Sequence, residues 1–373
     1  MKRSNRLDRF VDRYLGSIFI AAIGLLHKKN KRPKIIRNIG FVQPTAIGDL
    51  VMASGLIKSF SRRIYKETGI SPKVILYVGE TNYQAASFFC DRVETRVVNF
   101  KNIISTLRAM RADQIDILID LTPWARVTAI ISALSLSKYT IGFNAQKQFK
   151  HYSFDLVIPH SLQEHEAENL KRIYKGFFGD ELGYFEIGIR KPDVLRIADI
   201  SKISPTVAFH PCAGGSRARE KAWPIMNWVE LTRLLRQKNV QVVILGGSND
   251  VLVCNMLFNF LSKDEKFGVR NLCGRLSLNE YVNLTLLSHA LVSVDTGTLH
   301  LASMCGAKVV GLYGPTSSKR WGSIGMHTKH LDGGMEQDKT IQFGFEKCKS
   351  AKFAMTEITP ERVFARISEF GLF

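Results

Sequence analysis

Short apolar runs alternate with amphipathic stretches along most of the chain, a pattern typical of α/β proteins. In the first half, the apolar runs predict strands at residues 35–42, 73–78, 95–100, 115–121 and 139–143. The run at 115–121 is apolar at most positions, as expected for a strand buried on both faces of a parallel sheet. Spacings of three and four residues between apolar positions predict helices at 50–65 and 125–136.

The second half repeats this alternation after a region of mixed pattern. Its predicted strands are residues 206–210, 241–245, 290–294 and 309–313, and its predicted helices are 228–238, 278–288 and 299–305. Between the halves, a predicted helix at 163–178 leads into a stretch punctuated by Gly and Pro, which indicates a linker. We therefore predict two doubly wound, Rossmann-like domains with an inter-domain cleft. Ligands of such sheets bind beyond the carboxyl ends of the strands.

The N-terminal segment concentrates positive charge beside an apolar run. Residues 1–37 carry 11 Lys and Arg against Asp8 and Asp12, a net charge of +9. Residues 14–26 are mostly apolar and would form a helix of about 20 Å, shorter than the roughly 30 Å core of a bilayer. Their helical spacing predicts an amphipathic helix in a membrane interface, with the basic residues 27–32 against anionic head groups. The alternative is a helix that docks on the protein's own core. A cleaved signal peptide is disfavoured, because Lys and Arg, not small residues, follow Leu26.

Composition narrows the class of partner. The chain of 373 residues has 52 Lys and Arg against 33 Asp and Glu, a net charge of +19, so it should attract polyanions. Hydrophobic residues at 45% exclude wholesale disorder. Nucleic acid is disfavoured, because no aromatic residues are interleaved with the basic cluster. The six Cys lack the spacing of a zinc site, so we expect reduced thiols in the cytosol.

The segments that follow three predicted strands carry candidate chemistry. After the first strand, Gly48 permits a tight turn into a helix, and Asp49 is either the helix N-cap or a carboxylate that faces a ligand. Residues 210–216 form a loop of small residues followed by Arg and Lys, which suits a diphosphate or is simply a solvated basic loop. Residues 295–300 place a carboxylate, hydroxyls and a Gly at a helix N-terminus, another anion site. There Asp295 could instead be an N-cap and His300 a buried core histidine. No DxD pair or carboxylate cluster indicates a metal.

Taken together, the segments resemble glycosyltransferase family 9, the lipopolysaccharide heptosyltransferases with a GT-B fold. The resemblance runs from about residue 35 to the end of the chain and rests on residues 46–49, 120–122, 141–143, 165–169, 210–216, 221–224, 243–247, 294–302 and 310–316. It implies an inverting, metal-independent transfer from a nucleotide sugar, with ADP-heptose as the expected donor and no cofactor.

The resemblance also implies roles for individual residues. Asp49 corresponds to the general base on the acceptor hydroxyl, and Lys221 with Ser216 to the groups that hold the donor diphosphate. The predicted donor-binding set is Gly48, Ser216, Lys221, Gly246, Asp295, Thr296, Gly297, Thr298 and His300. The predicted acceptor-binding residues are Thr45, Trp124 and Arg126. No metal ligand is predicted.

These observations predict four parts of the chain. Residues 1–34 form a basic membrane-associating helix, 35–185 an acceptor-binding domain, 186–355 a nucleotide-sugar-binding domain, and 356–373 a helix that can return to the first domain. The predicted enzyme moves heptose onto a lipopolysaccharide core or a related phosphorylated, lipid-linked glycan. It acts peripherally at the cytoplasmic face of the bacterial inner membrane, on an anionic membrane surface. The alternatives are a GT-B nucleotide-sugar epimerase or hydrolase, and an inactive membrane protein that binds polyanions.

Overall fold

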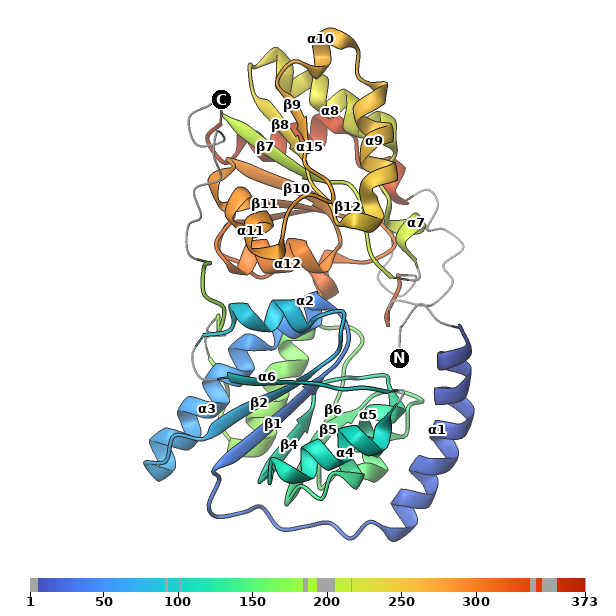
Figure 1. Cartoon of the computed structure of the whole chain (residues 1–373), viewed down its shortest axis with the longest axis vertical. Helices are drawn as coiled ribbons and strands as arrows, with labels where there is room; N and C mark the ends of the chain where they lie inside the picture. Colours follow the sequence, from blue (N-terminus) through green and yellow to red (C-terminus); the bar gives the residue numbers. More distant parts are fainter. Residues whose placement is uncertain are drawn as a thin grey trace. The chain divides into compact units, whose positions relative to one another are not determined.

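The structure is a computed structural model that describes residues 6–90, 93–100, 102–183, 187–192, 205–215, 217–335, 340–343 and 354–372, with backbone alone for 6–9. The chain divides into two compact units, Met1–Arg190 and Lys191–Phe373 (Figure 1). The division falls a few residues after the predicted boundary between residues 185 and 186. The N-terminal helix belongs to the first unit and the C-terminal helix to the second.

The first unit contains a parallel six-stranded sheet with the order β3-β2-β1-β4-β5-β6. Its strands are β1 (Asn38–Gln43), β2 (Lys73–Val78), β3 (Val93–Val97), β4 (Ile117–Asp120), β5 (Tyr139–Asn144) and β6 (Leu156–Pro159). Phe41 pairs with Leu76 on one side and with Ile119 on the other. Successive strands are therefore added outward on one side of β1 and then outward on the side of β4. The neighbouring strands β1 and β4 form a topological switch point.

Helices cover both faces of this sheet. They are α1 (Arg6–Leu26), α2 (Ile47–Met52), α3 (Ser54–Thr68), η1 (Tyr83–Phe88), α4 (Ile103–Ala112), α5 (Arg126–Leu134), η2 (Lys150–Ser153) and α6 (Glu166–Phe178). Side chains of β1 alternate between the faces. Phe41 meets Phe60 of α3, which packs on Phe177 of α6. Val42 joins the cluster under α4 and α5, which includes Met110.

Helix α1 docks on this unit through α5 and η2. Ile20 is buried and packs with Ala129 and Phe154. The helix thus adopts the alternative considered above, at least for one of its faces. Among the residues that the structure describes, none of the helices is long and apolar enough to cross a membrane.

The second unit repeats the same strand order. Its parallel sheet runs β12-β11-β10-β7-β8-β9. The strands are β7 (Thr206–His210), β8 (Gln241–Ile244), β9 (Val269–Asn271), β10 (Ala290–Val294), β11 (Val309–Tyr313) and β12 (Thr328–Asp332). Here the switch point lies between β7 and β10, which pair through Val292 and Phe209.

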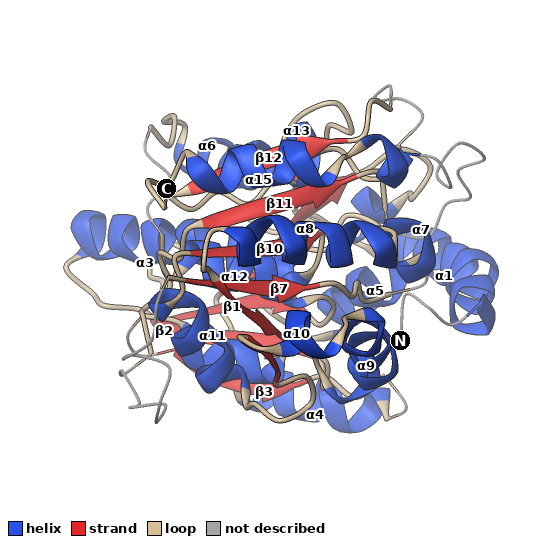
Figure 2. Ribbon diagram, turned by 90° about the horizontal axis from the view of Figure 1, so that it is seen from above, coloured by secondary structure: helices blue, strands red, loops and turns tan. Residues whose placement is uncertain are grey.

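The helices of the second unit also form two layers (Figure 2). They are α7 (Ala218–Lys221), α8 (Ile225–Gln237), η3 (Ser248–Asp250), α9 (Val251–Phe260), α10 (Lys263–Lys266), α11 (Leu278–Leu287), α12 (Gly297–Met304), α13 (Ser318–Trp321), η5 (Met355–Glu357) and α15 (Pro360–Ser368). One core joins α8, α9 and α15 to the sheet around the fully buried Trp228. Trp223 donates a hydrogen bond to the carbonyl of Ile358 (2.8 Å), which ties the C-terminal segment to this unit. We expected a helix at 356–373 that could return to the first domain, whereas α15 packs on α8 and β11.

Candidate active site

The loops predicted to bind phosphate follow β7 and β10, the two strands at the switch point of the second sheet. Reversal of the strand order leaves a crevice at the carboxyl ends of such neighbours. After β7 the chain is buried at Cys212 and exposed at Gly214 and Gly215. Gly215 has φ +88, a conformation that side chains rarely adopt, so the loop depends on this glycine. Ser216, predicted to bind phosphate, lies outside the described residues.

A charged cluster joins the two loops. Lys221, at the end of α7, places Nζ 2.6 Å from Oδ2 of Asp295, which follows β10. His300 places Nε2 3.5 Å from the other carboxylate oxygen. Burial raises the pKa of Asp295, but the charge of Lys221 and the contact with His300 outweigh it and hold the pKa well below its usual range. Asp295 is therefore ionised and holds the ammonium group of Lys221 at the switch point.

Helix α12 begins directly beside this cluster. Its N-cap is Thr296, so Asp295 does not occupy the N-cap position that we had considered for it. The side chain of Thr296 makes no capping hydrogen bond. Gly297 and Thr298 form the first turn, where free backbone N–H groups and the helix dipole favour an anion. His300 is buried, as a core histidine would be, yet it contacts Asp295 and so belongs to the cluster.

A second pair of buried polar groups at the end of β7 was not foreseen. Nδ1 of His210 lies 2.9 Å from the hydroxyl of Tyr281, on α11, and 3.5 Å from Oγ1 of Thr298. Burial lowers the pKa of His210 to about 4 and raises the pKa of Tyr281. Both groups are neutral near pH 7. The pairing spans residues far apart in sequence, so no local pattern predicts it.

Gly246, predicted to bind the donor, follows β8. A Cβ atom at Gly246 would lie 2.7 Å from Sγ of Cys273. The carbonyl of Gly246 accepts a hydrogen bond from the N–H of Gly274 (3.0 Å). Glycine is thus needed for packing at this position.

Cys90, Cys212, Cys254, Cys273 and Cys305 are free thiols, and Cys348 lies outside the described residues. Within the described part of the chain, no group of three or more His, Cys, Asp or Glu side chains could hold a metal ion.

In the first unit, Asp49 follows β1 at the other switch point. Helix α2 begins after Ala46, which is its N-cap and has φ 56. Asp49 is the acidic residue of the first turn, so the carboxylate does not take the N-cap position considered above. It is half-buried, and Gly48 beside it is buried. A carboxylate in the first turn of a helix is favoured by the dipole.

The loop before Asp49 is held by Asn82, which sequence reasoning missed. Nδ2 of this fully buried side chain donates to the carbonyls of Gln43 (2.8 Å) and Ala46 (3.3 Å). Its Oδ1 accepts the N–H of Gly79 (2.9 Å). A Cβ atom at Gly79 would lie 2.1 Å from the carbonyl oxygen of Pro44. The loop and the turn after β2 therefore interlock, and Asn82 stabilises the positive φ of Ala46.

The predicted acceptor residues follow β1 and β4. Thr45 is buried, and its hydroxyl has no hydrogen-bond partner among the described residues. Trp124 is buried in the loop after β4. Arg126, the first residue of α5, donates from a guanidinium nitrogen to the carbonyl of Lys147 (2.9 Å) and lies 3.6 Å from the carboxylate of Asp12. The structure thus gives this guanidinium partners within the protein, and its acceptor role stays a prediction.

A buried ion pair supports the loop that contains Trp124. Lys150 is fully buried, with Nζ 2.9 Å from Oδ2 of Asp120 and 2.9 Å from Oγ1 of Thr122. Asp120 also accepts hydrogen bonds from Thr122 and Thr128. The end of β4 is therefore fixed by a network of satisfied polar groups.

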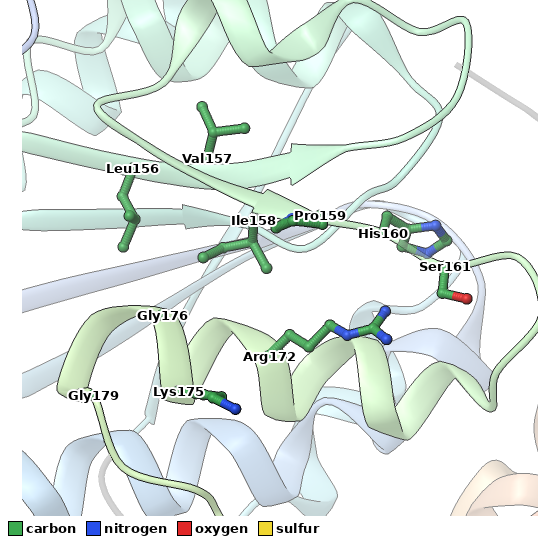
Figure 3. Close-up of a pocket in the computed structure, with 10 residues that line it drawn as sticks. All are labelled: Leu156, Val157, Ile158, Pro159, His160, Ser161, Arg172, Lys175, Gly176 and Gly179. Carbon is green, nitrogen blue, oxygen red and sulfur yellow. The ribbon is translucent and has the colours of Figure 1, made fainter.

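A pocket of about 630 Å³ lies between β6 and α6 (Figure 3). Leu156 and Ile158 point from the edge strand toward the helix, and Arg172 and Lys175 extend from it. Arg172 forms an ion pair with Glu164 and Lys175 with Glu181. None of the predicted site residues lines this pocket.

The model of a family described as glycosyltransferase family 9 (heptosyltransferase) matches residues 103–348, well over half of the chain. The chain belongs to glycosyltransferase family 9. The matched region includes Lys221, Asp295 and both strands of the second switch point. The family expected from the sequence motifs is confirmed.

Individual relatives agree with this assignment. Lipopolysaccharide heptosyltransferase 2 of Escherichia coli strain K12 is 31% identical over 118 residues, 32% of this chain and 33% of the relative. That match thus spans a third of the length of the relative. Lipooligosaccharide heptosyltransferase 2 of Campylobacter jejuni subsp. jejuni serotype O:2 is 24% identical over 333 residues, 86% of this chain and 94% of the relative.

The fold is shared with a solved structure of the family. The structure of the E. coli ADP-heptose lipopolysaccharide heptosyltransferase II has a TM-score of 0.67 with this chain at 18% identity, covering 89% of this chain and 98% of that chain. At this identity the likeness concerns the fold alone. It confirms the predicted GT-B fold of this family 9 member.

Proposed function

We propose that this family 9 member transfers heptose from ADP-heptose to a lipopolysaccharide core or a related lipid-linked surface glycan. The observation that carries the proposal is the Lys221–Asp295–His300 cluster at the β7/β10 switch point, beside the N-terminus of α12. Membership of the family supports the reaction class. The printed name of the solved relative, an ADP-heptose enzyme, supports the choice of donor.

On the donor side, Lys221 and the first turn of α12 bind the diphosphate. As the bond between the anomeric carbon and ADP breaks, negative charge grows on the leaving oxygen. A preorganised ammonium and free N–H groups stabilise that charge. Asp295 is the positioning residue that holds Lys221 in place. We assign Ser216, Gly246, Thr296, Gly297, Thr298 and His300 to the same binding surface.

On the acceptor side, Asp49 acts as general base. It removes the proton of the acceptor hydroxyl while that oxygen attacks the anomeric carbon opposite the leaving ADP. The products are the glycoside with inverted configuration, ADP, and a proton on Asp49. No step requires a metal ion. Thr45, whose buried hydroxyl has no partner in the part of the chain that the structure describes, and Trp124 are proposed to contact the acceptor, with Gly48 shaping the turn.

The substrate determines where the enzyme acts. A lipid-linked, phosphorylated acceptor made inside the cell is reached at the cytoplasmic face of the inner membrane. We propose that the enzyme is peripheral there, with its positive charge facing anionic lipid.

Nucleotide binding is the first test. Thermal shifts with ADP, UDP, GDP and dTDP should show stabilisation by ADP above the others. Incubation with ADP-heptose and a core-glycan acceptor should then give ADP and the glycosylated product. Asp49→Asn should lose about a hundredfold to ten-thousandfold in transfer rate but keep its response to ADP, because a general base contributes about 10² to 10⁴. Asp264→Asn, an acidic surface residue in α10, is the matched control. Preference for another nucleotide would overturn the donor assignment. ADP release without an acceptor product would favour a hydrolase.

A further inference from the structure

Helix α1 has two faces of opposite character. One face carries Asp12, Gly16, Ile20 and Gly24, spaced four residues apart and therefore aligned along the helix. A Cβ atom at Gly16 would lie 3.1 Å from Cβ of Arg126. At Gly24 it would lie 2.9 Å from a side-chain carbon of η2. The backbone of α1 thus packs directly on the unit, and we call this side its docked face.

The docked face also makes specific hydrogen bonds to α5. Asp12 is buried, and its two carboxylate oxygens accept the N–H groups of Arg126 (3.2 Å) and Val127 (2.9 Å). These N–H groups belong to the first turn of α5 and have no partners within that helix. Asp12 therefore caps α5 from another element. This contact fixes both the position and the rotation of α1.

The other side of α1, its outward face, is apolar and exposed to solvent. Its large side chains are between 44% and 89% exposed; they are Phe10, Val11, Tyr14, Leu15, Ile18, Phe19, Leu25 and Leu26. Soluble monomers rarely present a continuous apolar surface of this extent. Because the docked face fixes the rotation of the helix, the outward face cannot turn inward. It requires a partner.

Charge beside the outward face identifies that partner. Lys28, Lys29, Lys31 and Lys34 follow the helix and are exposed. Together with the rest of residues 1–37 they give a net charge of +9. A second copy of the chain would bring the same charge against this one. An anionic bilayer offers both an apolar interior for the outward face and negative head groups for the lysines.

We propose that the outward face of α1 inserts into the interface of a membrane containing anionic lipid, while the docked face holds the first unit against that membrane. The helix acts as a fixed platform and not as a flexible tether. The inference rests on the exposed face and its flanking charge, and does not depend on the identity of the donor.

The test uses the full chain and sedimentation with vesicles of phosphatidylcholine, with and without phosphatidylglycerol. The wild type should bind the anionic vesicles more strongly. The variant Leu15→Ser/Ile18→Ser/Phe19→Ser should lower the partition coefficient at least about tenfold, because it removes three apolar contacts with lipid. Its melting temperature should stay near that of the wild type, since these side chains point away from the unit.

Matched substitutions elsewhere serve as controls. Leu252→Ser/Met256→Ser/Phe260→Ser changes a similarly exposed apolar row on α9 and should leave vesicle binding unchanged. For charge, Lys28→Gln/Lys29→Gln/Lys31→Gln should weaken binding to anionic vesicles only. The control Lys66→Gln/Lys238→Gln/Lys263→Gln, which removes the same charge at exposed sites of α3 and the second unit, should weaken it much less.

Several outcomes would overturn the proposal. One is a wild type that fails to bind anionic vesicles, and another is equal loss of binding in the α9 control. A third is a dimer that the outward-face variant converts to a monomer without any vesicle binding, which would make a second copy the partner. The thermal response to ADP is recorded on the same samples. Failure of donor binding therefore remains separate from failure of membrane binding.

Discussion

The ammonium group of Lys221 lies 2.6 Å from the carboxylate of Asp295 and joins the loops after β7 and β10. The two residues are 74 positions apart, and only the adjacency of these two strands brings them together. Because Asp295 stays ionised, Lys221 is held in place before any ligand arrives. A cation fixed in this way loses little conformational freedom when a diphosphate binds.

Replacing this cation should chiefly affect the donor. In Lys221→Met the charge-assisted contact with the diphosphate is lost, so the Kd for ADP should rise about tenfold to a hundredfold. Isothermal titration calorimetry measures this directly. Lys263→Met, at an exposed position on α10, should leave the Kd unchanged. An unaltered affinity in the Lys221 variant would remove this residue from the donor site.

Asn82 should matter for turnover more than for donor binding. Asn82→Ala removes the side chain that donates to the carbonyls of Gln43 and Ala46 and accepts the N–H of Gly79, so the loop before Asp49 loses this support. We expect kcat to fall about tenfold to a hundredfold with an unchanged Kd for ADP, because the base is displaced. Stability should fall by about 1–3 kcal/mol. A variant that lost stability but kept full kcat would show Asn82 to be structural alone.

Strands with a strong local apolar pattern were predicted well. Strands that form mainly because they pair with a neighbouring strand were not. The run at 73–78 matches β2, and 206–210 matches β7. The edge strands β6, β9 and β12 were missed, because they are short and take much of their stability from a single neighbour. The predicted helix at 50–65 is divided at Ala53 into α2 and α3. Apolar spacing continues through that break and does not reveal it.

The same distinction holds for the site. The loops after β1, β7 and β10 were predicted because Gly, Asp and Thr follow apolar runs directly. Asn82 and Tyr281 were missed, because each acts on a loop about 40 or more residues away in the chain. Arg126 was assigned to the acceptor from the family resemblance, while its contact with Asp12 depends on the docking of α1.

The buried pair of Lys150 and Asp120 should be essential to the first unit. Lys150→Met leaves a carboxylate buried without its cation, which costs about 3–5 kcal/mol. Chemical denaturation should show this loss in the free energy of unfolding. The double variant Lys150→Met/Asp120→Asn should recover part of it, because neither charge is then stranded. A double variant no more stable than the single one would contradict the pairwise account.

His210 should make the second unit sensitive to mild acid. Its pKa is about 4 in the folded protein, because burial disfavours the charged ring, against about 6.5 when unfolded. Between these values the unfolded state binds the extra proton, so the free energy of unfolding falls as the pH drops. The full effect is roughly 3 kcal/mol, reached near pH 4. The stability from a neutral His210 is thus complete above about pH 7 and is lost progressively as the pH falls toward about 4.

A variant isolates this contribution from the other histidines. His210→Asn cannot take up the proton, so its stability should fall less steeply from pH 7 to pH 4.5 than that of the wild type. The variant starts from a lower value at pH 7, because it loses the ring that packs against Tyr281. The difference between the two proteins should therefore shrink as the pH falls, measured by urea denaturation at each pH. A constant difference would mean that His210 binds protons equally in the folded and unfolded states, and therefore that the fold does not lower its pKa.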